Sequence, residues 1–538
     1  MHNFWNLLLI MSDRRSTSVI VVGAGVAGLQ ASRLLREESI PVVLLEGRDR
    51  IGGRVHTSTH TVKTITGESV TIRHDEGAAW VHGLGFSWPD AVNESVTECS
   101  PPRNPMLALL QEASGSAKNL WSYELNPVFP KGNPWMRPKS CLYEDDQLAV
   151  YCEGKLLDNA LLVKSLDRHW TIMDEIENLG QMLLKSDRYD VTLKKSLREA
   201  LNRVLKMKEF RQQRKKKDYM ELEQLRQFYV HLIELWYAGS VDTLQLSEFV
   251  DLDQEVGTDG DASYECQGDF FGPHCTVTSG MSIILTPLTN HGEEILLSQE
   301  VISIREMEDK VEVRTRSGLI LETDVCVVTI PLACLKAHGN SMFHPTLSTD
   351  KLEALKILKV GQYKKVFLTF DKIFWAEGPA FLGFLLPDSV SPLGKHLLAD
   401  NLWARNGIPC LEVVLTAEAA VWAKDKPEHV IRDTVIAFLM EAVHVTDLNC
   451  LSCYVTRWEE DPFSLGAYSN FGIGSQDRHS AAFRQPDWDG KLIFAGEHTI
   501  SECEGSVHAA LYSGYNAAKS VIQYLTKNAD LNDVKEAF

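Results

Sequence analysis

Apolar and polar positions near the start of the chain follow two alternating patterns. Residues 18–23 form an unbroken apolar run rich in β-branched side chains, which predicts a buried strand. Residues 29–35 carry apolar side chains at helical spacing, and residues 41–45 form a second apolar run. The pattern therefore predicts a strand, a turn, a helix and a second strand.

A glycine-rich turn joins the first strand to the helix. Gly23 permits a tight turn, Gly25 lets the backbone approach a pyrophosphate, and Gly28 lets the helix pack closely on the strand. The free N–H groups and the dipole at the helix start favour phosphates. Glu46, 18 residues after Gly28, is placed to accept both ribose hydroxyls. These residues, with Ala27, predict a dinucleotide site but do not separate NAD from FAD.

A second loop whose backbone can closely approach a bound dinucleotide begins at Glu46. It contains Arg48 and a double glycine whose second member, Gly53, precedes Arg54. Each arginine can meet phosphate or ribose oxygens, and a nicotinamide dehydrogenase does not need this element. With this loop, the run of residues 19–55 resembles the flavin-containing amine oxidase family, which binds FAD in a Rossmann-like domain.

Later segments resemble the same family, in the family's order: residues 75–83, 296–332, 360–375, 458–469 and 493–514. The resemblance implies that residues 75–83 pass along the flavin ring. It also implies that Val301 meets the adenine through its backbone. The resemblance also implies that the following residues contact the cofactor: Ala79, Trp80, Val301, Trp458, Glu497, Ser506 and Val507.

Matched and unmatched stretches alternate along the chain, which implies two interleaved domains. We expect an α/β, Rossmann-like FAD-binding domain from residues 15–95, 276–345 and 480–527. An α+β substrate domain would comprise residues 96–275, whose stretch 156–234 has helical apolar spacing, and residues 346–479. Residues 1–14 and 528–538 are expected to be flexible ends.

Lys365 is the most specific chemical residue of the chain. The resemblance implies that it faces inward and holds a water near flavin N5, where a buried lysine can relay protons. Its neighbour Lys364 is then expected to be a surface lysine, because adjacent strand residues face opposite sides.

A Gly-x-Tyr element follows at residues 466–468. Monoamine oxidases carry a flavin-linked cysteine here, whereas this chain has Ala467, so we expect noncovalent FAD. The resemblance places Tyr468 as an aromatic wall in front of the flavin, where an amine would lie well. A core tyrosine is the alternative reading.

His82 lies in a Trp-Val-His-Gly run, similar to polyamine oxidases that shorten spermine or acetylated polyamines. In those enzymes the histidine hydrogen-bonds a substrate nitrogen. Ser506 lies where such enzymes carry a small hydroxyl residue, and it is a second candidate contact for the amine. Lys365, His82 and Tyr468 are thus the expected catalytic residues. The alternative, that His82 is an ordinary loop histidine, remains open.

Acidic residues are the natural partners of the distal ammonium groups of a polyamine. Glu502, Glu504 and Glu234 are the candidates, and acidic surface residues are the alternative reading for each. The loop of residues 501–504 lacks the family's usual aromatic residue, which leaves the shape of the amine site open.

The composition of the chain limits the classes of partner and the compartment that we expect. The 538 residues include 54 Lys and Arg against 73 Asp and Glu, a net charge of −19. This balance argues against nucleic-acid binding and suits a cationic substrate, although acidity also keeps proteins soluble. A hydrophobic content of 44% excludes a disordered chain. The 11 scattered cysteines indicate neither a disulfide framework nor a metal site and favour a reducing compartment.

Targeting signals are weak. No apolar run approaches the roughly 18–20 residues of a membrane span, and the apolar residues 4–11 lack the charge and cleavage site of a signal peptide. Met11 is an alternative start. We expect a cytoplasmic protein, with the basic run 211–217 as a candidate nuclear address or a solvated helix face.

The expected function is FAD-dependent oxidation of a polyamine (spermine, spermidine or an acetylated form) at a carbon next to an amine. Oxygen would reoxidise the flavin, so the products are an aldehyde, a shorter amine and hydrogen peroxide. Three alternatives stay open: another amine or amino-acid oxidase, a lysine demethylase-like enzyme, and a catalytically silent FAD-binding scaffold. An amino-acid oxidase needs an arginine facing the flavin, and no motif supplies one. Whether the protein is a monomer or a homodimer is open.

Overall fold

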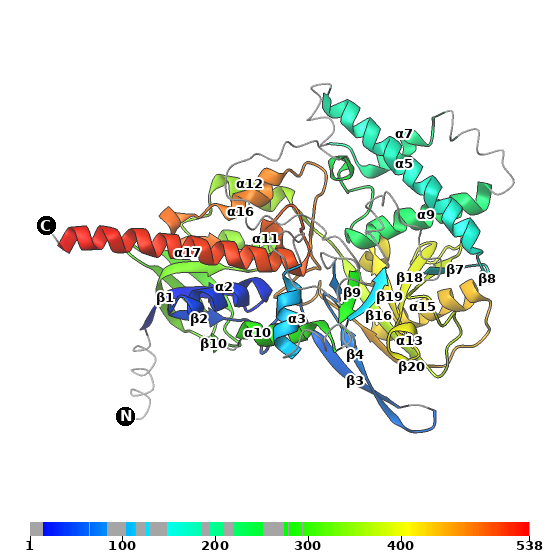
Figure 1. Ribbon diagram of the computed structural model, residues 1–538, viewed down its shortest axis with the longest axis horizontal. Helices are drawn as coiled ribbons and strands as arrows, with labels where there is room; N and C mark the ends of the chain where they lie inside the picture. Colours follow the sequence, from blue (N-terminus) through cyan, green and yellow to red (C-terminus); the bar gives the residue numbers. More distant parts are fainter. Residues whose placement is uncertain are drawn as a thin grey trace, which may run out of the picture.

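Figure 1 shows two lobes, each built on one large sheet. The computed structural model describes residues 14–63, 65–82, 104–114, 125–129, 148–185, 194–207, 210, 219–250, 274–277, 279–289, 291–292 and 294–536. The alternative start at Met11 and the basic run 211–217 lie outside the described residues. Within the described residues, no helix is long and apolar enough to cross a membrane.

The first sheet has eight strands in the described part of the chain and a parallel centre. β1 pairs in parallel with both β2 and β13, and β22 pairs in parallel with β13. In spatial order the strands are β10 (Glu294–Leu296), β2 (Val42–Leu45), β1 (Arg14–Val22), β13 (Ile320–Val328), β12 (Val311–Thr315), β11 (Val301–Glu306) and β14 (Phe343–His344), with β22 (Leu492–Phe494) beside β13.

Both faces of this sheet are covered, which explains the unbroken apolar run of β1. Val19 and Val21 enter the core on one face, and Ile20 and Val22 enter the core on the other. On the first face α2 and α17 lie side by side (Figure 1). The helices around this sheet are α2 (Val26–Glu37), α3 (Met106–Ser114), α10 (Thr286–Thr289), α11 (Leu332–Met342), α12 (Thr349–Ile357), α16 (Asp477–Arg484) and α17 (Val507–Glu536).

The second sheet has seven strands among the described residues and is mostly antiparallel. Val366 and Leu368 of β16 pack into a core with α15, and the intervening residues face the other way. In spatial order the strands are β20 (Cys450–Val455), β16 (Tyr363–Phe370), β19 (Cys410–Thr416), β18 (His396–Asn401), β17 (Phe381–Leu385), β7 (Leu148–Cys152) and β8 (Lys155–Leu156).

Helices and short sheets complete the second lobe. The helical spacing of residues 156–234 is confirmed by α5, α7 and α9. The helices of this lobe are α5 (Asn159–Lys185), α7 (Leu197–Val204), α9 (Tyr219–Trp236), α13 (Leu402–Asn406), α14 (Ala417–Ala423) and α15 (Glu428–Val443). The short sheets pair β15 (Lys359–Val360) with β21 (Ser469–Asn470), β3 (Thr57–Lys63) with β4 (Ser69–Asp75), and β9 (His274–Val277) with both β5 (Trp80–Val81) and β6 (Leu125–Phe129). Four 3₁₀ turns are described: η2 (Leu246–Phe249), η3 (Met281–Leu285), η4 (Trp488–Gly490) and η5 (Glu497–Thr499).

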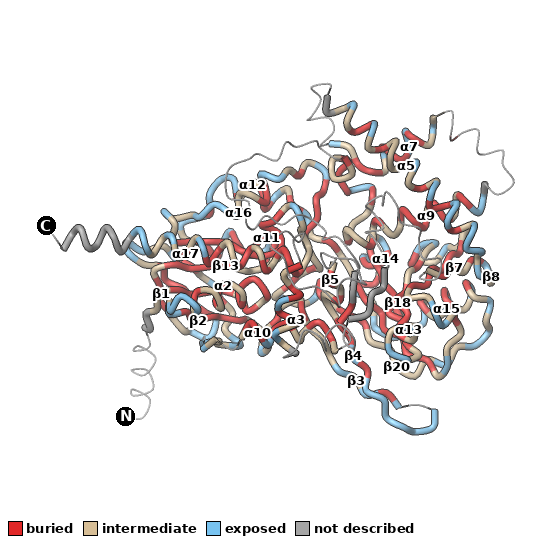
Figure 2. The backbone as a smooth tube through the Cα atoms, viewed as in Figure 1, coloured by how far each residue is buried: buried red, intermediate tan, exposed pale blue. Residues whose placement is uncertain are grey.

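The hairpin of β3 and β4 projects from the body, with an exposed tip (Figure 2). The expected fold class is confirmed: a Rossmann-like α/β part is interleaved with an α+β part. The expected domain boundaries remain a proposal, and α17 extends past residue 527, where a flexible end was expected.

Candidate active site

One cavity of about 1100 Å³ brings nearly all the predicted site residues together. Its wall includes residues from both large sheets. The predicted cofactor residues on it are Gly23, Gly25, Ala27, Glu46, Arg48, Gly53, Arg54, Ala79, Trp80, Val301, Trp458, Glu497, Ser506 and Val507. The predicted catalytic residue Lys365 and the predicted substrate residues His82, Tyr468, Ser506, Glu502 and Glu504 also lie on it.

Gly28 does not line the cavity but shapes it. A Cβ at this position would lie 1.9 Å from the carbonyl oxygen of Gly23, so only glycine lets α2 start this close to β1. A Cβ on Gly25, in contrast, would meet nothing within 4 Å. No side chain caps the N-terminus of α2, so its N–H groups are available at the cavity wall. This cradle fits the pyrophosphate of a dinucleotide.

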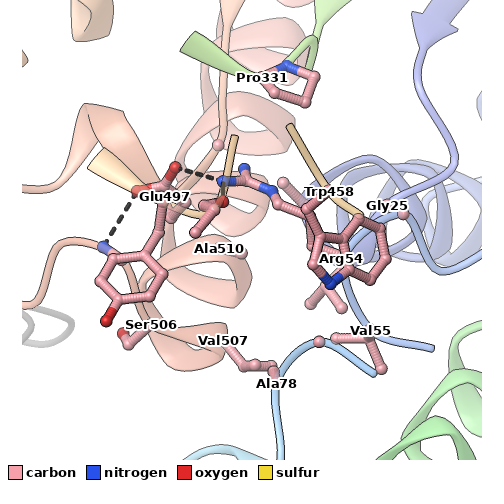
Figure 3. Close-up of a pocket in the computed structure, with 18 of the residues that line it drawn as sticks. Gly25, Arg54, Val55, Ala78, Pro331, Trp458, Glu497, Ser506, Val507 and Ala510 are labelled. Atoms are coloured by element: carbon pink, nitrogen blue, oxygen red, sulfur yellow. Dashed lines mark hydrogen bonds and ion pairs between the residues drawn. The ribbon is translucent and has the colours of Figure 1, made fainter. Parts of the chain in front are cut away.

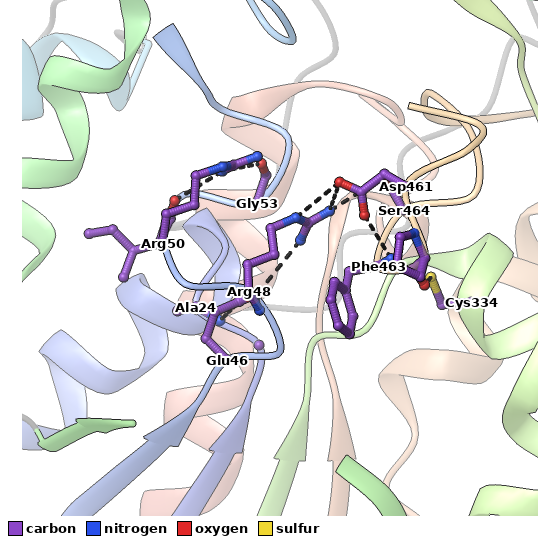
Figure 4. A network of polar contacts seen from close by, with 12 residues as sticks. Ala24, Glu46, Arg48, Arg50, Gly53, Cys334, Asp461, Phe463 and Ser464 are labelled. Carbon is purple, nitrogen blue, oxygen red and sulfur yellow. Dashed lines mark hydrogen bonds and ion pairs between the residues drawn. The ribbon is translucent and has the colours of Figure 1, made fainter. Parts of the chain in front are cut away.

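Glu46 joins the two glycine loops. Its carboxylate accepts hydrogen bonds from the backbone N–H of Ala24, at 2.8 Å, and of Arg48, at 2.9 Å. Arg48 itself is held by Asp461, with its Nε and Nη2 at 3.1 and 3.0 Å from Oδ2 (Figure 4). The loop is therefore fixed without a ligand, and much of the Arg48 guanidinium is already committed.

Arg54 and Glu497 form an ion pair across the cavity wall (Figure 3). Arg54 Nη1 lies 2.8 Å from Glu497 Oε1, and it also donates to the carbonyl of Ala467 at 2.6 Å. The second carboxylate oxygen accepts from the Ser469 hydroxyl at 2.5 Å and from the Gly505 N–H at 3.0 Å. Burial alone would raise the pKa of Glu497, but the charges of Arg54 and His498 and the hydrogen bonds from Ser469 and Arg54 together outweigh it, so the pKa lies below its ordinary value.

The prediction that Lys365 faces inward is confirmed. It is 5% exposed and lines the cavity. The prediction for Lys364 is wrong: this residue is 1% exposed and forms an ion pair with Glu459. The strand does place the two lysines on opposite sides, but the outer side is covered by the chain around residue 459, which supplies a countercharge.

Tyr468 is both an anchored core tyrosine and part of the cavity wall, the two alternatives that the sequence left open. Its hydroxyl donates to the backbone carbonyl oxygens of Leu235, at 3.2 Å, and Trp236, at 2.8 Å, so it is anchored to the end of α9. Its ring lines the cavity. Tyr363, which sequence reasoning missed, lines the cavity 6.2 Å away between ring centroids. Its place at the start of a strand gave no signal of this.

His82 and Ser506 both line the cavity, in different settings. The His82 ring lies 5.1 Å from that of Trp236, edge to face. Ser506 donates to the carbonyl of Cys503 at 2.7 Å and accepts from the N–H of Ala509 at 3.0 Å. Its hydroxyl hydrogen is therefore already used within the turn before α17.

The three candidate acids separate. Glu504 lines the cavity, and burial, then the charge of Glu248, raises its pKa. Glu502 is exposed and lies 3.8 Å from Arg484. Glu234 is not among the residues that line the cavity; its carboxylate accepts from the N–H of Val241 at 3.1 Å, so the structure does not bring this candidate to the site.

Two acidic residues on the cavity wall with strongly raised pKa values were not identified from the sequence. Burial, then the charge of Asp477, raises the pKa of Glu248 to about 8. Burial, then the charge of Glu412, raises the pKa of Asp400 to about 7. Each interrupts a short apolar stretch, which is the one signal that could have marked it.

The cysteines depart from one expectation. Cys503, on the cavity wall, is disulfide-bonded, so the expected reduced state is wrong at this position. Cys450 and Cys453 stand three positions apart on β20 and are free. Burial raises the pKa of both thiols, which disfavours the reactive thiolate. Within the described residues, no group of three or more His, Cys, Asp or Glu could hold a metal ion.

Comparison with known proteins decides the family. The family described as flavin containing amine oxidoreductase matches residues 26–522. The chain belongs to the flavin-containing amine oxidoreductase family. Membership implies a flavin cofactor and an amine substrate, consistent with a cavity that joins a dinucleotide cradle to an acidic end.

Several curated relatives match most of the chain. Polyamine oxidase 4 of Oryza sativa subsp. japonica is 28% identical over 95% of this chain and 90% of its own length. Polyamine oxidase 2 of Arabidopsis thaliana is 28% identical over 94% of this chain and 88% of its own length. Lysine-specific histone demethylase 1 homolog 3 of Oryza sativa subsp. indica is 28% identical over 97% of this chain. This chain spans only 56% of that demethylase homolog.

Proposed function

We propose that the protein binds FAD noncovalently and oxidises a polyamine at a carbon next to an amine. The products are an aldehyde, a shorter amine and, after reoxidation by oxygen, hydrogen peroxide. The observation that carries the proposal is a single cavity lined both by a dinucleotide cradle and by the acidic residues Glu248 and Glu504.

The cofactor would lie along the residues with fixed geometry. The N-terminus of α2 receives the pyrophosphate, and Glu46 receives the ribose hydroxyls. The backbone of Val301 faces the adenine. Ala467, in place of a linking cysteine, supports noncovalent binding. When bound, FAD supplies the acceptor for a hydride from the substrate carbon.

The reacting amine would lie between the cofactor and the aromatic wall. Tyr468 is held by two backbone carbonyls, so its ring keeps one orientation. His82 orients the substrate nitrogen by a hydrogen bond, and Lys365 holds a water at the inner end of the cavity. Desolvation of the amine against the ring of Tyr468 also favours the neutral amine over the ammonium ion.

The acidic end selects substrates with a second ammonium group. Glu248 and Glu504 are partly exposed, line the cavity, and have no ion-pair partner among the described residues. Burial, and then the like charge of a neighbouring acid, raises the pKa of both. A distal ammonium supplies a countercharge, and a monoamine such as tyramine does not.

A lysine demethylase-like activity is the second candidate, because the demethylase homolog matches over 97% of this chain. A methylated lysine in a peptide would present one amine to the same site. A cytoplasmic or nuclear location and a monomeric or homodimeric state remain proposals beside either activity.

Product analysis tests the proposal. The full chain with bound flavin is incubated in air with spermine, spermidine, N-acetylspermine, tyramine or a dimethyl-lysine peptide. We expect peroxide and a shortened amine from at least one polyamine, with little from tyramine or the peptide. Turnover of the peptide alone would establish the second candidate, and peroxide from none of them would contradict both.

A further inference from the structure

Three ionisable side chains meet on the cavity side of the seven-stranded sheet. β19 lies between β16 and β18, and its register pairs Lys365 with Val414 and Asp400 with Glu412. Directly paired residues of an antiparallel sheet project from the same face, and diagonal neighbours two residues along also touch. Lys365, Glu412 and Asp400 therefore form a row across three strands.

Glu412 fixes the position of Lys365. Lys365 Nζ lies 2.9 Å from Glu412 Oε1 and donates to the backbone carbonyl of Asp75 at 2.7 Å. Glu412 is 3% exposed and does not line the cavity. Two of the three Lys365 N–H groups are thus directed into the protein, which leaves one for the cavity.

Asp400 brings a carboxylate of this row to the cavity wall. It is 4% exposed, and its Oδ2 lies 3.1 Å from Arg405 Nη2. Arg405 in turn lies over the ring of Trp80, at 5.7 Å from the centroid. The other ionisable groups that act on Asp400 are Glu412, Lys365 and, from β16, the hydroxyl of Tyr363.

The charges of this row make Asp400 the group that takes up a proton. Lys365 compensates Glu412 directly, whereas Asp400 faces Glu412 as a like charge. Burial and this repulsion raise the pKa of Asp400 to about 7. A base is most effective when its pKa is near the working pH, and oxidation requires one, because a polyamine arrives as an ammonium ion and must become neutral before hydride can leave.

We propose that Asp400 accepts the proton of the substrate ammonium group, and that Glu412 is a positioning residue that holds Lys365 beside it. In this step the ammonium N–H bond breaks, its electron pair stays on nitrogen, and an O–H bond forms on Asp400. The inference rests on the proposed function, since it needs an amine in the cavity.

The first test reads the proton directly and does not depend on turnover. Infrared difference spectra of the oxidised protein, taken over about two pH units on each side of 7, report protonated carboxyl groups. The spectra are taken in a Glu248→Gln background, because Glu248 also titrates in this range. In that background we expect a carboxyl band that titrates near 7 and that is absent when Asp400→Asn is added. A band that persists unchanged in Asp400→Asn overturns the inference.

The second test is the pH dependence of flavin reduction by spermine in single-turnover mixing. Asp400→Asn should slow flavin reduction at pH 7 by about 10²-fold, the lower range for a positioned base. Its pH profile should also lack the limb near 7, which is the rise in reduction rate as the base loses its proton. Asp400→Glu should restore that limb. Glu412→Gln should shift the limb to lower pH, because the like charge is gone. Glu418→Gln, on the exposed face of α14, is the matched control.

The outcomes separate the two proposals. If no amine reduces the flavin of the parent, the proposed function fails, and with it the proton transfer. If the parent is reduced and Asp400→Asn has the same rate and the same pH profile, the proposed function stands and the role of Asp400 is overturned.

Discussion

The cofactor end and the substrate end of the cavity differ in how their charged groups are paired. At the cofactor end, Glu46 accepts from two backbone N–H groups, Arg48 is held by Asp461, and Arg54 is paired with Glu497. At the substrate end, burial raises the pKa of Glu248, Glu504 and Asp400. The charged groups of the cofactor end are paired within the protein, whereas the carboxyl groups of the substrate end tend to keep their protons until a cationic ligand arrives.

This difference follows from what each end binds. A dinucleotide is held by backbone N–H groups and a rigid shape, so its site benefits from side chains that are already fixed. A polyamine brings its own positive charges, so a site with buried, poorly compensated carboxylates gains most from it. The following changes should affect the two ends differently.

The largest effect is expected at the cofactor end. Arg54→Met leaves the buried Glu497 carboxylate without its partner, which should cost about 3–5 kcal/mol in the free energy of unfolding and most of the bound flavin. Denaturant titration and the flavin absorbance per chain measure the two. The control is Arg478→Met, which breaks the exposed pair with Glu353 away from the cavity and should change stability and flavin content little, because solvent screens an exposed pair. Equal losses in both variants would contradict the account.

The next effect concerns Lys365 and its neighbour. Lys365→Met should slow flavin reduction by amine at least about tenfold and up to about 10²-fold or more, the scale of a proton-handling group. Lys364→Met removes the partner of Glu459 instead. It should lower stability but leave the rate per bound flavin nearly unchanged. Rates from single-turnover mixing that fall equally in both variants would show that the cavity-facing position has no special role.

Substrate affinity should depend on one acid of the loop before α17. Glu504→Gln should weaken spermine binding about 10- to 100-fold, because a buried charge-assisted contact is worth roughly 1.5–3 kcal/mol. Glu502→Gln, a change at the exposed neighbour, should have little effect. Titration calorimetry with oxidised enzyme and spermine gives both values. Similar affinities for the two variants would remove Glu504 from the site.

The last prediction concerns the pH dependence of stability without substrate. The pKa of Glu248 is about 8 in the folded protein against 4.5 for a free glutamate, so between these values the folded state binds more protons than the unfolded state. Stability should therefore fall as pH rises through this window, by up to about 1.4 kcal/mol per pH unit. Glu248→Gln should have a flatter profile in thermal unfolding. An identical slope would show that Glu248 ionises freely in the fold.

The cofactor end could be predicted because its signals are local in the chain. Gly23, Gly25, Gly28 and Glu46 act through one turn and the strands beside it, so their spacing carries the geometry. Even here, the partner of Arg48 was hidden: Asp461 lies 413 residues further along.

The substrate end could not be predicted in the same way. Asp400, Glu412 and Lys365 come together through the register of three strands, and neither spacing nor hydrophobic pattern encodes that register across connections of this length. The prediction for Lys364 was wrong for a related reason, since the alternation of strand residues gives the direction of a side chain but not what covers it.

Anaerobic mixing of the flavin-loaded protein with spermine, followed by flavin absorbance, tests the central claim most directly. The account predicts rapid bleaching by spermine and much slower bleaching by tyramine at equal concentration, because tyramine has no second ammonium for the acidic end. Bleaching by tyramine as fast as by spermine, or by neither amine, would contradict it.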